Sequence, residues 1–287
     1  MAAQNTRSNQ KSTIIQATNN NYDQLADFFN QCHYIHRHLD WFTTLDWLGD
    51  QSFLYESVND QIEAVICTAP ENNDIAWIRA FGVREKKHLK AHWKKLLAEA
   101  TQKLRGSGIR KLASLALHGW FEDLLKAEYF NNHHNILVLE WQGDFPKRQP
   151  SDLEIRSMTA SDLPFVEIID HIAFPSLWQN SLAGLRKAFH QTGISTVAIK
   201  KGQVIGYQIS TAMTIYGHLA RLAVHPDYQR QGIGYAIVYD LLKRFEHRGF
   251  WRVTVNTQSN NLPSLRLYDQ FNFIRTDEEI PVYELDI

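Results

Sequence analysis

Cysteine and long apolar runs are scarce in this chain of 287 residues, and each scarcity excludes a class of protein. Only two cysteines occur, Cys32 and Cys67, which excludes a disulfide framework and is typical of a reducing compartment such as the cytoplasm. No run of 18 apolar residues is present, so we expect no transmembrane helix. Residues 1–11 are polar and lack the apolar core of a signal peptide, so we interpret them as a mobile tail.

An excess of charge of either sign is also lacking. Lys and Arg number 30 and Asp and Glu number 31, which gives a formal net charge of −1 at pH 7. Without a basic excess we expect neither nucleic acid nor an anionic membrane as a partner. Aromatic residues, in contrast, make up 12% of the chain, and its length is enough for two well-packed domains of ordinary size.

The most informative stretch is Gln-Arg-Gln-Gly-Ile-Gly at residues 229–234. It follows an apolar run ending at Val224 and precedes a run with helical periodicity. A strand, a glycine turn and a helix N-terminus form an anion site, because the first helical turn has unpaired N–H groups and the positive end of the helix dipole. Gly232 and Gly234 lack Cβ atoms, so a phosphate group can approach the backbone closely. The sequence therefore predicts a phosphorylated ligand at this turn.

Two common phosphate motifs do not fit the turn. A dinucleotide fingerprint needs a third glycine or alanine where this chain has Ile237, and a P-loop needs Gly-Lys-Ser/Thr. Further along come Asn261-Leu-Pro-Ser-Leu-Arg-Leu-Tyr268 and Phe271-Asn272-Phe273. Together with the glycine turn, these segments resemble the GNAT superfamily of acyl-CoA-dependent N-acyltransferases over residues 152–287.

Two positions depart from the pattern of that family. Ser264 stands where the family has alanine, and Asn272 stands where it has glycine. Asparagine is the residue that, after glycine, best tolerates a positive φ, so the second departure is mild.

The resemblance implies an N-acetyltransferase that moves acetyl from acetyl-CoA to a primary amine by direct attack in a ternary complex. The acceptor is either a small-molecule amine or a protein N-terminus, and the sequence leaves oligomer formation open. The resemblance places the pyrophosphate on backbone N–H groups of the turn and the pantetheine arm along the preceding strand. The residues it assigns to cofactor binding are Leu222, Val224, Gln229, Arg230, Gln231, Gly232, Ile233, Gly234, Tyr235 and Asn261.

The same resemblance assigns catalytic roles. A backbone N–H near Leu222 polarises the thioester carbonyl, and Tyr268 is the general acid that protonates the leaving sulfur. A phenol, with a reference pKa near 10, stays protonated at neutral pH and can donate to a thiolate. Asn261 either bonds the cofactor arm or caps a helix, and Tyr268 has a core tyrosine as its alternative interpretation. The general base is left open among His218, His225, Glu278, Glu279 and a water molecule.

The acceptor is expected at a loop between two helices, Ala173-Phe-Pro-Ser-Leu-Trp178-Gln-Asn. There Phe174 and Trp178 are candidate apolar walls of a binding pocket. The alternative is a joining loop whose aromatic side chains close the core. The Cys32-His33-Tyr-Ile-His36-Arg-His38 tract lacks the second ligand pair of a zinc site, so we predict no metal.

The chain repeats itself at a period of 141 residues, for example from Ile14 to Ile155 and from Gly108 to Gly249 (155 − 14 = 249 − 108 = 141). We therefore predict an α/β (α+β) fold with two tandem GNAT-like domains, each a mixed, mostly antiparallel sheet flanked by helices. Their predicted ranges are 12–143 and 153–287. The polar segment 144–152 is the predicted linker.

The first half lacks the glycine turn of the second. Shifted by 141 residues, Ala91 and Trp93 stand in place of the two glycines. We therefore interpret residues 12–143 as a degenerate, non-catalytic domain, with a different ligand near Arg79, Arg84 or His118 as the alternative. For the whole chain, the alternatives to the enzyme are a non-catalytic acyl-CoA sensor or scaffold, and transfer of a longer acyl group.

Overall fold

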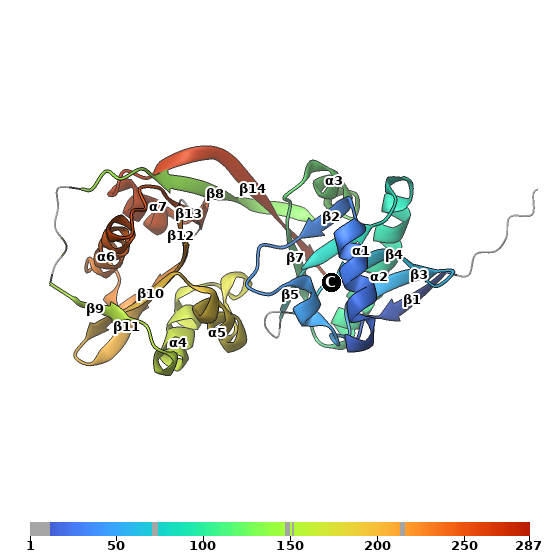
Figure 1. The fold of residues 1–287 in the computed structure, drawn as a ribbon, viewed down its shortest axis with the longest axis horizontal. Helices are drawn as coiled ribbons and strands as arrows, with labels where there is room; N and C mark the ends of the chain where they lie inside the picture. Colours follow the sequence, from blue (N-terminus) through green and yellow to red (C-terminus); the bar gives the residue numbers. More distant parts are fainter. Residues whose placement is uncertain (1–11, 71–73, 147–149, 151, 213–215) are drawn as a thin grey trace, which may run out of the picture. The chain divides into compact units, whose positions relative to one another are not determined.

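The computed structural model of the protein describes residues 12–70, 74–146, 150, 152–212 and 216–287. They form two compact units (Figure 1). Unit 1 contains the described residues up to Asn131 together with Glu284–Ile287, and unit 2 contains Asn132–Tyr283. The predicted tail lies outside the described residues, as do residues 147–149 and 151 of the predicted linker.

Unit 1 is a mixed sheet structure with three helices. Its strands are β1 (Ser12–Gln16), β2 (Tyr34–Arg37), β3 (Phe53–Val58), β4 (Gln61–Cys67), β5 (Ile75–Trp77), β6 (Ala80–Val83) and β7 (Lys111–Leu115). Its helices are α1 (Tyr22–Gln31), α2 (Leu89–Gly106) and α3 (Gly119–Ala127), with 3-10 turns η1 (Asn19–Asn21), η2 (Thr44–Trp47) and η3 (Lys86–His88). Five strands form a sheet in the order β1-β3-β4-β6-β2, and β5 pairs in parallel with β7.

Unit 2 has a longer sheet in the order β14-β8-β13-β12-β11-β10-β9. Its strands are β8 (Asn131–Trp141), β9 (Glu154–Ser157), β10 (Ile194–Lys200), β11 (Gln203–Ala212), β12 (Gly217–Val224), β13 (Val253–Gln258) and β14 (Ile274–Asp286). The helices are α4 (Leu163–Ala173), α5 (Leu182–Gln191), α6 (Ile233–His247) and α7 (Leu262–Asp269), with 3-10 turns η4 (Ala160–Asp162), η5 (Ser176–Trp178) and η6 (Pro226–Tyr228).

The predicted repeat is confirmed by element positions and by register. Ala76 pairs with Leu112 and Gly217 pairs with Val253, and both partners differ by 141 (217 − 76 = 253 − 112 = 141). Gly108 and Gly249 both end a helix with positive φ, 84° and 79°, which is the usual glycine C-terminal signal. The two halves are therefore two copies of one fold, as predicted.

The compact units do not follow the predicted boundary at 144–152. Strand β8 precedes that segment, yet Trp141 to Ile136 pair with Val253 to Gln258 of β13 in unit 2. The end of the chain belongs to unit 1, where Ile287 N donates to Arg110 O and Glu284 forms an ion pair with Lys111. The reason is an exchange of the last strand of each repeat, which periodicity along the sequence does not reveal.

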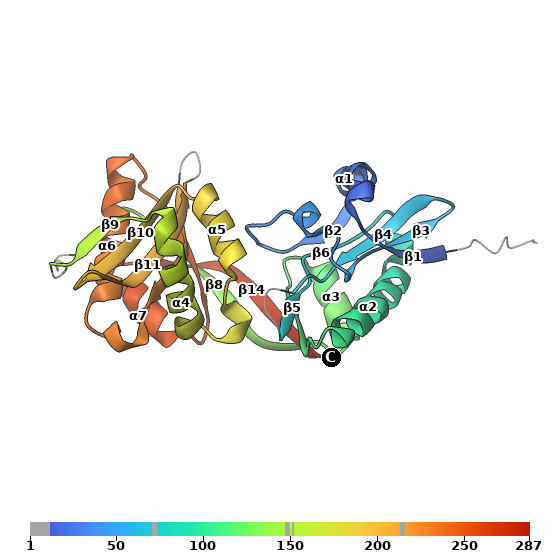
Figure 2. The same cartoon turned by 90° about the horizontal axis from the view of Figure 1, so that it is seen from below.

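Helices cover both faces of the sheet in unit 2. Helix α6 buries Ile233 and Ile237 against Ala198 and Ile205, while α4 and α5 contact the opposite face (Figure 2). A larger core lies around Phe245 and Phe271 and includes Leu139 and Trp141 of β8. Among the described residues, no helix is long and apolar enough to cross a membrane.

Unit 1 contains a fully buried histidine, His36, and a half-buried one, His38. His36 is fully buried and stacks on Phe121 with ring centroids 3.9 Å apart. Burial lowers its pKa from 6.5 to about 3, and burial also lowers the pKa of His38 well below its ordinary value. Within the described part of the chain, the Nδ1 atoms of both rings are buried without a hydrogen-bond partner. Both rings are therefore neutral at pH 7.

We expect His36→Leu to flatten the pH dependence of stability between pH 7 and pH 5. The unfolded chain gains this proton near pH 6.5 and the folded chain only near pH 3, so stability is complete above pH 6.5 and falls as the pH drops toward 3. At pH 5 this group alone costs about 2 kcal/mol of unfolding free energy. Denaturant unfolding at several pH values measures the slope. His33→Leu, at an exposed position, should keep the wild-type slope, and an unchanged slope for His36→Leu would contradict the assignment.

Candidate active site

The glycine turn has the backbone geometry of an anion site. After β12 ends at Val224, Arg230 and Gly232 adopt positive φ values of 59° and 82°, and α6 begins at Ile233. Gly232 is the N-terminal cap and has no side chain to accept the first amides of the helix. No described residue accepts a hydrogen bond from the N–H groups of Ile233 or Gly234. These N–H groups are therefore available to an external acceptor at the positive end of α6.

Glycine is needed at the two positions of the turn for different physical reasons. A Cβ at Gly232 would meet nothing within 4 Å, so the space beside this residue is open. Glycine is needed there because the backbone is left-handed. A Cβ at Gly234 would lie 3.3 Å from Leu267 and 3.8 Å from Val224. Gly234 therefore serves the packing of α6 on α7 and β12, whereas the sequence had assigned it to close approach of a phosphate.

Polar side chains hold the turn in place. Gln229 Nε2 donates to Val224 O at 3.0 Å, and Gln231 Nε2 donates to Asp227 O at 2.9 Å. Lys200 Nζ donates to Gln231 Oε1 at 3.1 Å, which brings a cation to the turn. Beside it lies a hollow of about 320 Å³, lined by Asp152, Leu153, Glu154, Ile199, Lys200, Lys201, Gln231 and Ile233.

Strand β12 leaves an open edge next to this turn. Its parallel pairing with β13 has three pairs and ends at Leu219↔Val255. On its other side a bulge at Ala220 separates Leu219↔Ser210 from Arg221↔Ile209, and pairing with β11 continues to Val224. Within the described residues, the segment 220–224 has no partner on the β13 side. An extended ligand can therefore pair with this edge like an added strand.

Beyond the bulge, successive side chains of β12 alternate between the two faces of the sheet. Leu222 and Val224, both predicted at the cofactor arm, pack beside Ile233 and Ile237 under α6. Arg221 points to the α4 face, where it contacts Asp170. The side chains of Leu222 and Val224 thus belong to the core, and their predicted role stays with their backbone groups.

Tyr268 lies in the same hydrophobic core as Leu219, in the first half of β12. It is 4% exposed and packs with Leu219, and its ring centroid is 5.4 Å from that of Phe273. Burial raises the pKa of Tyr268 above its ordinary value of 10. Among the described residues, burial is the one cause of this shift, and no hydrogen bond to the hydroxyl contributes to it. The side chain is thus a protonated donor with an unused hydrogen, which suits a general acid.

The two asparagines of the motif have structural duties. Asn261 Oδ1 accepts from Ser264 N at 3.2 Å, so Asn261 caps α7, which was one of its two predicted roles. Asn272 has φ 59°, which confirms that asparagine supplies the positive φ in place of the family's glycine. Contact of Asn261 with a cofactor stays a prediction.

The predicted acceptor loop is fixed by a buried ion pair that sequence reasoning missed. Arg221 Nη2 lies 2.6 Å from Asp170 Oδ2 and donates to Trp178 O at 2.5 Å. The guanidinium carbon of Arg221 lies 3.7 Å from the centroid of the Phe174 ring. Phe174, through its ring, and Trp178, through its carbonyl, therefore meet at one cation, and both residues are half-buried. No sequence motif links Asp170 to Arg221, since they are 51 positions apart.

The candidates for the general base differ in their surroundings. His218 Nδ1 bonds Thr254 Oγ1 at 2.8 Å, and burial lowers the pKa of His218, so its ring is neutral. His225 Nδ1 accepts from Asp227 N within the turn η6. Glu279 is hydrogen-bonded by Asn135 and paired with Arg275, contacts that lower its pKa. The choice of base stays open.

The corresponding groove of unit 1 is filled by its own chain. Strand β2 pairs with β6, with Tyr34 opposite Val83 and Arg37 opposite Ala80, where unit 2 leaves the β12 edge open. Trp93, the counterpart of Gly234, is 1% exposed and packs on Phe81 at a centroid distance of 4.9 Å. Its indole fills the core of unit 1. Both features favour the predicted degenerate character of the first half.

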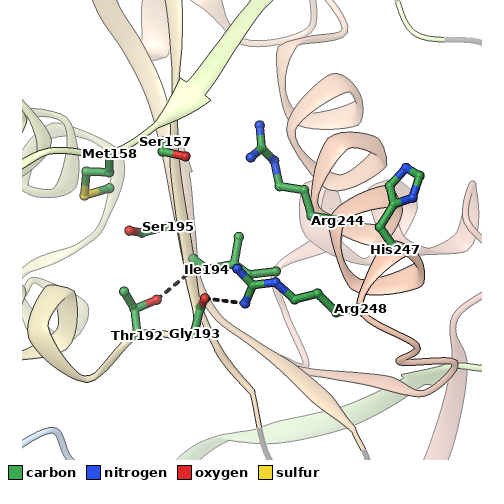
Figure 3. Close-up of a pocket in the computed structure, with 9 residues that line it drawn as sticks. All are labelled: Ser157, Met158, Thr192, Gly193, Ile194, Ser195, Arg244, His247 and Arg248. Atoms are coloured by element: carbon green, nitrogen blue, oxygen red, sulfur yellow. Dashed lines mark hydrogen bonds between the residues drawn. The ribbon is translucent and has the colours of Figure 1, made fainter.

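Unit 2 has a second hollow, away from the glycine turn. Figure 3 shows a basic hollow of about 370 Å³ near the C-terminal end of α6, lined by Ser157, Met158, Thr192, Gly193, Ile194, Ser195, Arg244, His247 and Arg248. There Arg248 Nη1 donates to Gly193 O at 2.8 Å, and Arg244 is paired with Asp240. This hollow is at the opposite end of α6 from the glycine turn. Among described residues, no group of three or more His, Cys, Asp or Glu side chains is placed to hold a metal.

Comparison with known proteins agrees with the fold and supplies a family. Residues 162–273 match the model of the acetyltransferase (GNAT) family. The ribosomal protein bS18-alanine N-acetyltransferase of Escherichia coli (strain K12) is 25% identical over 119 residues, 42% of this chain and 79% of that protein. The glucosamine 6-phosphate N-acetyltransferase of Trypanosoma brucei brucei is 27% identical over 134 residues, 42% of this chain and 89% of that protein.

A solved structure extends the likeness to both halves. A tandem GNAT protein from the clavulanic acid biosynthesis pathway has a TM-score of 0.65 at 10% identity, covering 96% of this chain and 98% of that one. At this identity the likeness shows the fold alone. The family match and the curated relatives identify residues 162–273 as a GNAT acyltransferase domain. The whole chain has the fold of two GNAT-like domains in tandem.

We expect Gly232→Val to weaken binding of coenzyme A at least tenfold. A residue with a Cβ pays roughly 1–2 kcal/mol for the left-handed conformation, so the turn will change its path and its amides will no longer converge. Gly249→Val is the matched control, because Gly249 has φ 79° and open space at the other end of α6. Titration calorimetry with coenzyme A measures both variants. Equal losses in the two variants would contradict a ligand at the turn.

Proposed function

We propose that this protein is an acetyl-CoA-dependent N-acetyltransferase whose active site lies in unit 2. The open edge of β12 beside the amide turn of α6 carries the proposal. An acyl-CoA presents an extended arm with amide groups and a diphosphate, and this edge and turn offer partners for both. The open space at Gly232 and the ammonium group of Lys200, which donates to Gln231, both suit a diphosphate.

Each residue then has a defined task. The N–H groups of Ile233 and Gly234 bind the diphosphate, and the turn residues Gln229 to Gly232 shape the site. Acetyl-CoA supplies an acetyl group activated as a thioester. A backbone N–H near Leu222 polarises its carbonyl oxygen, and Tyr268 donates a proton to the sulfur. Phe174 and Trp178 line the place of the amine that attacks.

The acceptor is a primary amine of a small molecule or of a protein N-terminus. The two curated relatives modify ribosomal protein bS18 and glucosamine 6-phosphate, one from each class. An alanine-initiated peptide and glucosamine 6-phosphate are therefore the first acceptors to assay. Both cysteines are free thiols, which supports action in a reducing compartment such as the cytoplasm.

We expect Tyr268→Phe to lower kcat by roughly 10²-fold, the usual scale for a positioned acid, with acetyl-CoA affinity close to wild type. The thiol released from acetyl-CoA in the presence of each acceptor measures the rate. Tyr283→Phe, which alters another buried tyrosine of unit 2, should keep the wild-type kcat. A wild-type rate in Tyr268→Phe would remove the assignment. Cofactor binding without acceptor-dependent thiol release in the wild type would instead favour a sensor or scaffold.

We expect one acetyl-CoA to bind per chain. Unit 1 has β2 on the edge that unit 2 keeps open, so the second copy of the fold offers no equivalent groove. Titration calorimetry of the full-length chain gives the stoichiometry, and Gly232→Val should weaken all of the binding. A second equivalent that survives in Gly232→Val would show that unit 1 binds the cofactor too.

A further inference from the structure

The buried carboxylate of Asp170 is satisfied by four donor groups from three parts of unit 2. Asp170 lies in α4 and is 0% exposed. Tyr207 of β11 donates its hydroxyl to Oδ2, Arg221 of β12 donates from Nε at 2.8 Å and Nη2 lies at 2.6 Å, and Asn180 N donates to Oδ1 at 2.8 Å. A charge buried this completely persists only because it is fully paired.

The ion pair of Asp170 with Arg221 contacts both ends of the loop 174–180. Phe174 lies under the guanidinium of Arg221, Trp178 offers its carbonyl to the same side chain, and Asn180 donates to Asp170 itself. Gln179 Nε2 adds one bond inside the loop, to Phe174 O at 3.0 Å, and one to the end of α4, at His171 O (2.9 Å). One ion pair thus ties the loop to β12 at the residue that precedes Leu222.

The first half of the chain shows the same segment without this ion pair. At the repeat distance of 141, Phe29 stands for Asp170 and Ala80 stands for Arg221 (170 − 29 = 221 − 80 = 141). The counterpart of residues 175–178 is β2, residues 34–37, and it pairs along β6, with Arg37 opposite Ala80. Where the ion pair is replaced by apolar residues, the segment lies on the strand edge that unit 2 leaves open.

We propose that Arg221 is a positioning residue, whose ion pair with Asp170 holds the loop 174–180 as an acceptor wall clear of the open edge of β12. The inference rests on the proposed function, because it concerns how the acceptor meets the acyl donor. Arginine is required for geometric reasons. Its planar fork reaches Asp170 and Trp178 O together, whereas the single ammonium of lysine is a point charge that does not reproduce this fork.

The first test needs neither acceptor nor cofactor. In Arg221→Lys without added ligand, we expect amide hydrogen exchange of residues 174–180 to accelerate at least roughly tenfold, because local opening no longer breaks the arginine contacts. Arg156→Lys is the matched control. It alters another arginine paired twice with a buried carboxylate, Asp162 (2.7 and 2.8 Å), at the opposite end of α4. Unchanged exchange in Arg221→Lys, or equal acceleration in both variants, would overturn the proposal.

The second test separates the acceptor from the donor. With the alanine-initiated peptide and glucosamine 6-phosphate as probes, Arg221→Lys should lower kcat/KM for the acceptor roughly tenfold or more, while the Kd for acetyl-CoA changes less than about twofold. Arg156→Lys should match the wild type in both measurements. A parallel loss of acetyl-CoA affinity would assign Arg221 to the cofactor strand and overturn the proposal.

A third variant guards against misfolding. If the lysine variant is poorly folded, the double variant Asp170→Asn/Arg221→Gln leaves no unpaired buried charge and should show the same rapid exchange and acceptor defect. A folded double variant with wild-type exchange and kinetics would overturn the proposal. If the wild type itself transfers acetyl to neither probe and does not bind acetyl-CoA, the proposed function fails. The exchange measurement still reports on Arg221 in that case.

Discussion

The short parallel pairing between β12 and β13 is the constraint on which the site depends. Three pairs hold the strands together from Gly217 to Leu219, and the bulge at Ala220 then changes the direction of β12. Because a strand alternates its side chains, Arg221 reaches the α4 face while Leu222 reaches the α6 face. Backbone groups between them face the opening, and the amide turn of α6 follows directly after the strand. One local irregularity thus arranges an edge, a turn and a loop anchor.

An open strand edge must be satisfied, because backbone N–H and C=O groups that lack partners are costly to bury. The two halves of the chain meet this requirement differently. In unit 1 the chain supplies β2, with Ile35 opposite Gly82 and His36 opposite Phe81. The neutral ring of His36 then fits among aromatic side chains and reaches Ile78 O at 3.3 Å. In unit 2 the described residues leave this edge of β12 unpaired beyond Leu219, which is the arrangement that the proposed binding of an extended ligand requires.

The sequence was sufficient for the features that depend on local backbone chemistry. The glycine turn, the positive φ of Asn272 and the repeat all follow from residue type and spacing, and the structure confirms each as a feature of backbone or fold. The ion pair of Asp170 with Arg221 could not be predicted, because neither residue has a neighbouring partner that marks it as buried. The pairing of β2 with β6 could not be predicted for the same reason. Residues 34–37 align with residues 175–178, which form a loop in the other copy, and what makes β2 a strand is its pairing with β6, more than 40 positions away.

The exchange of last strands makes the core of unit 2 depend on a strand from the first half of the chain. Strand β8 precedes the predicted linker, yet Leu137, Leu139 and Trp141 pack in the same core as Tyr268 and Phe271. The whole length of β13 pairs with β8, from Val253↔Trp141 to Gln258↔Ile136. A chain beginning at the linker would leave the outer edge of β13 without a partner and remove part of the core beneath the candidate acid. Under the proposed function, the first half therefore supports the candidate site through β8, which pairs with β13 and packs beside Tyr268.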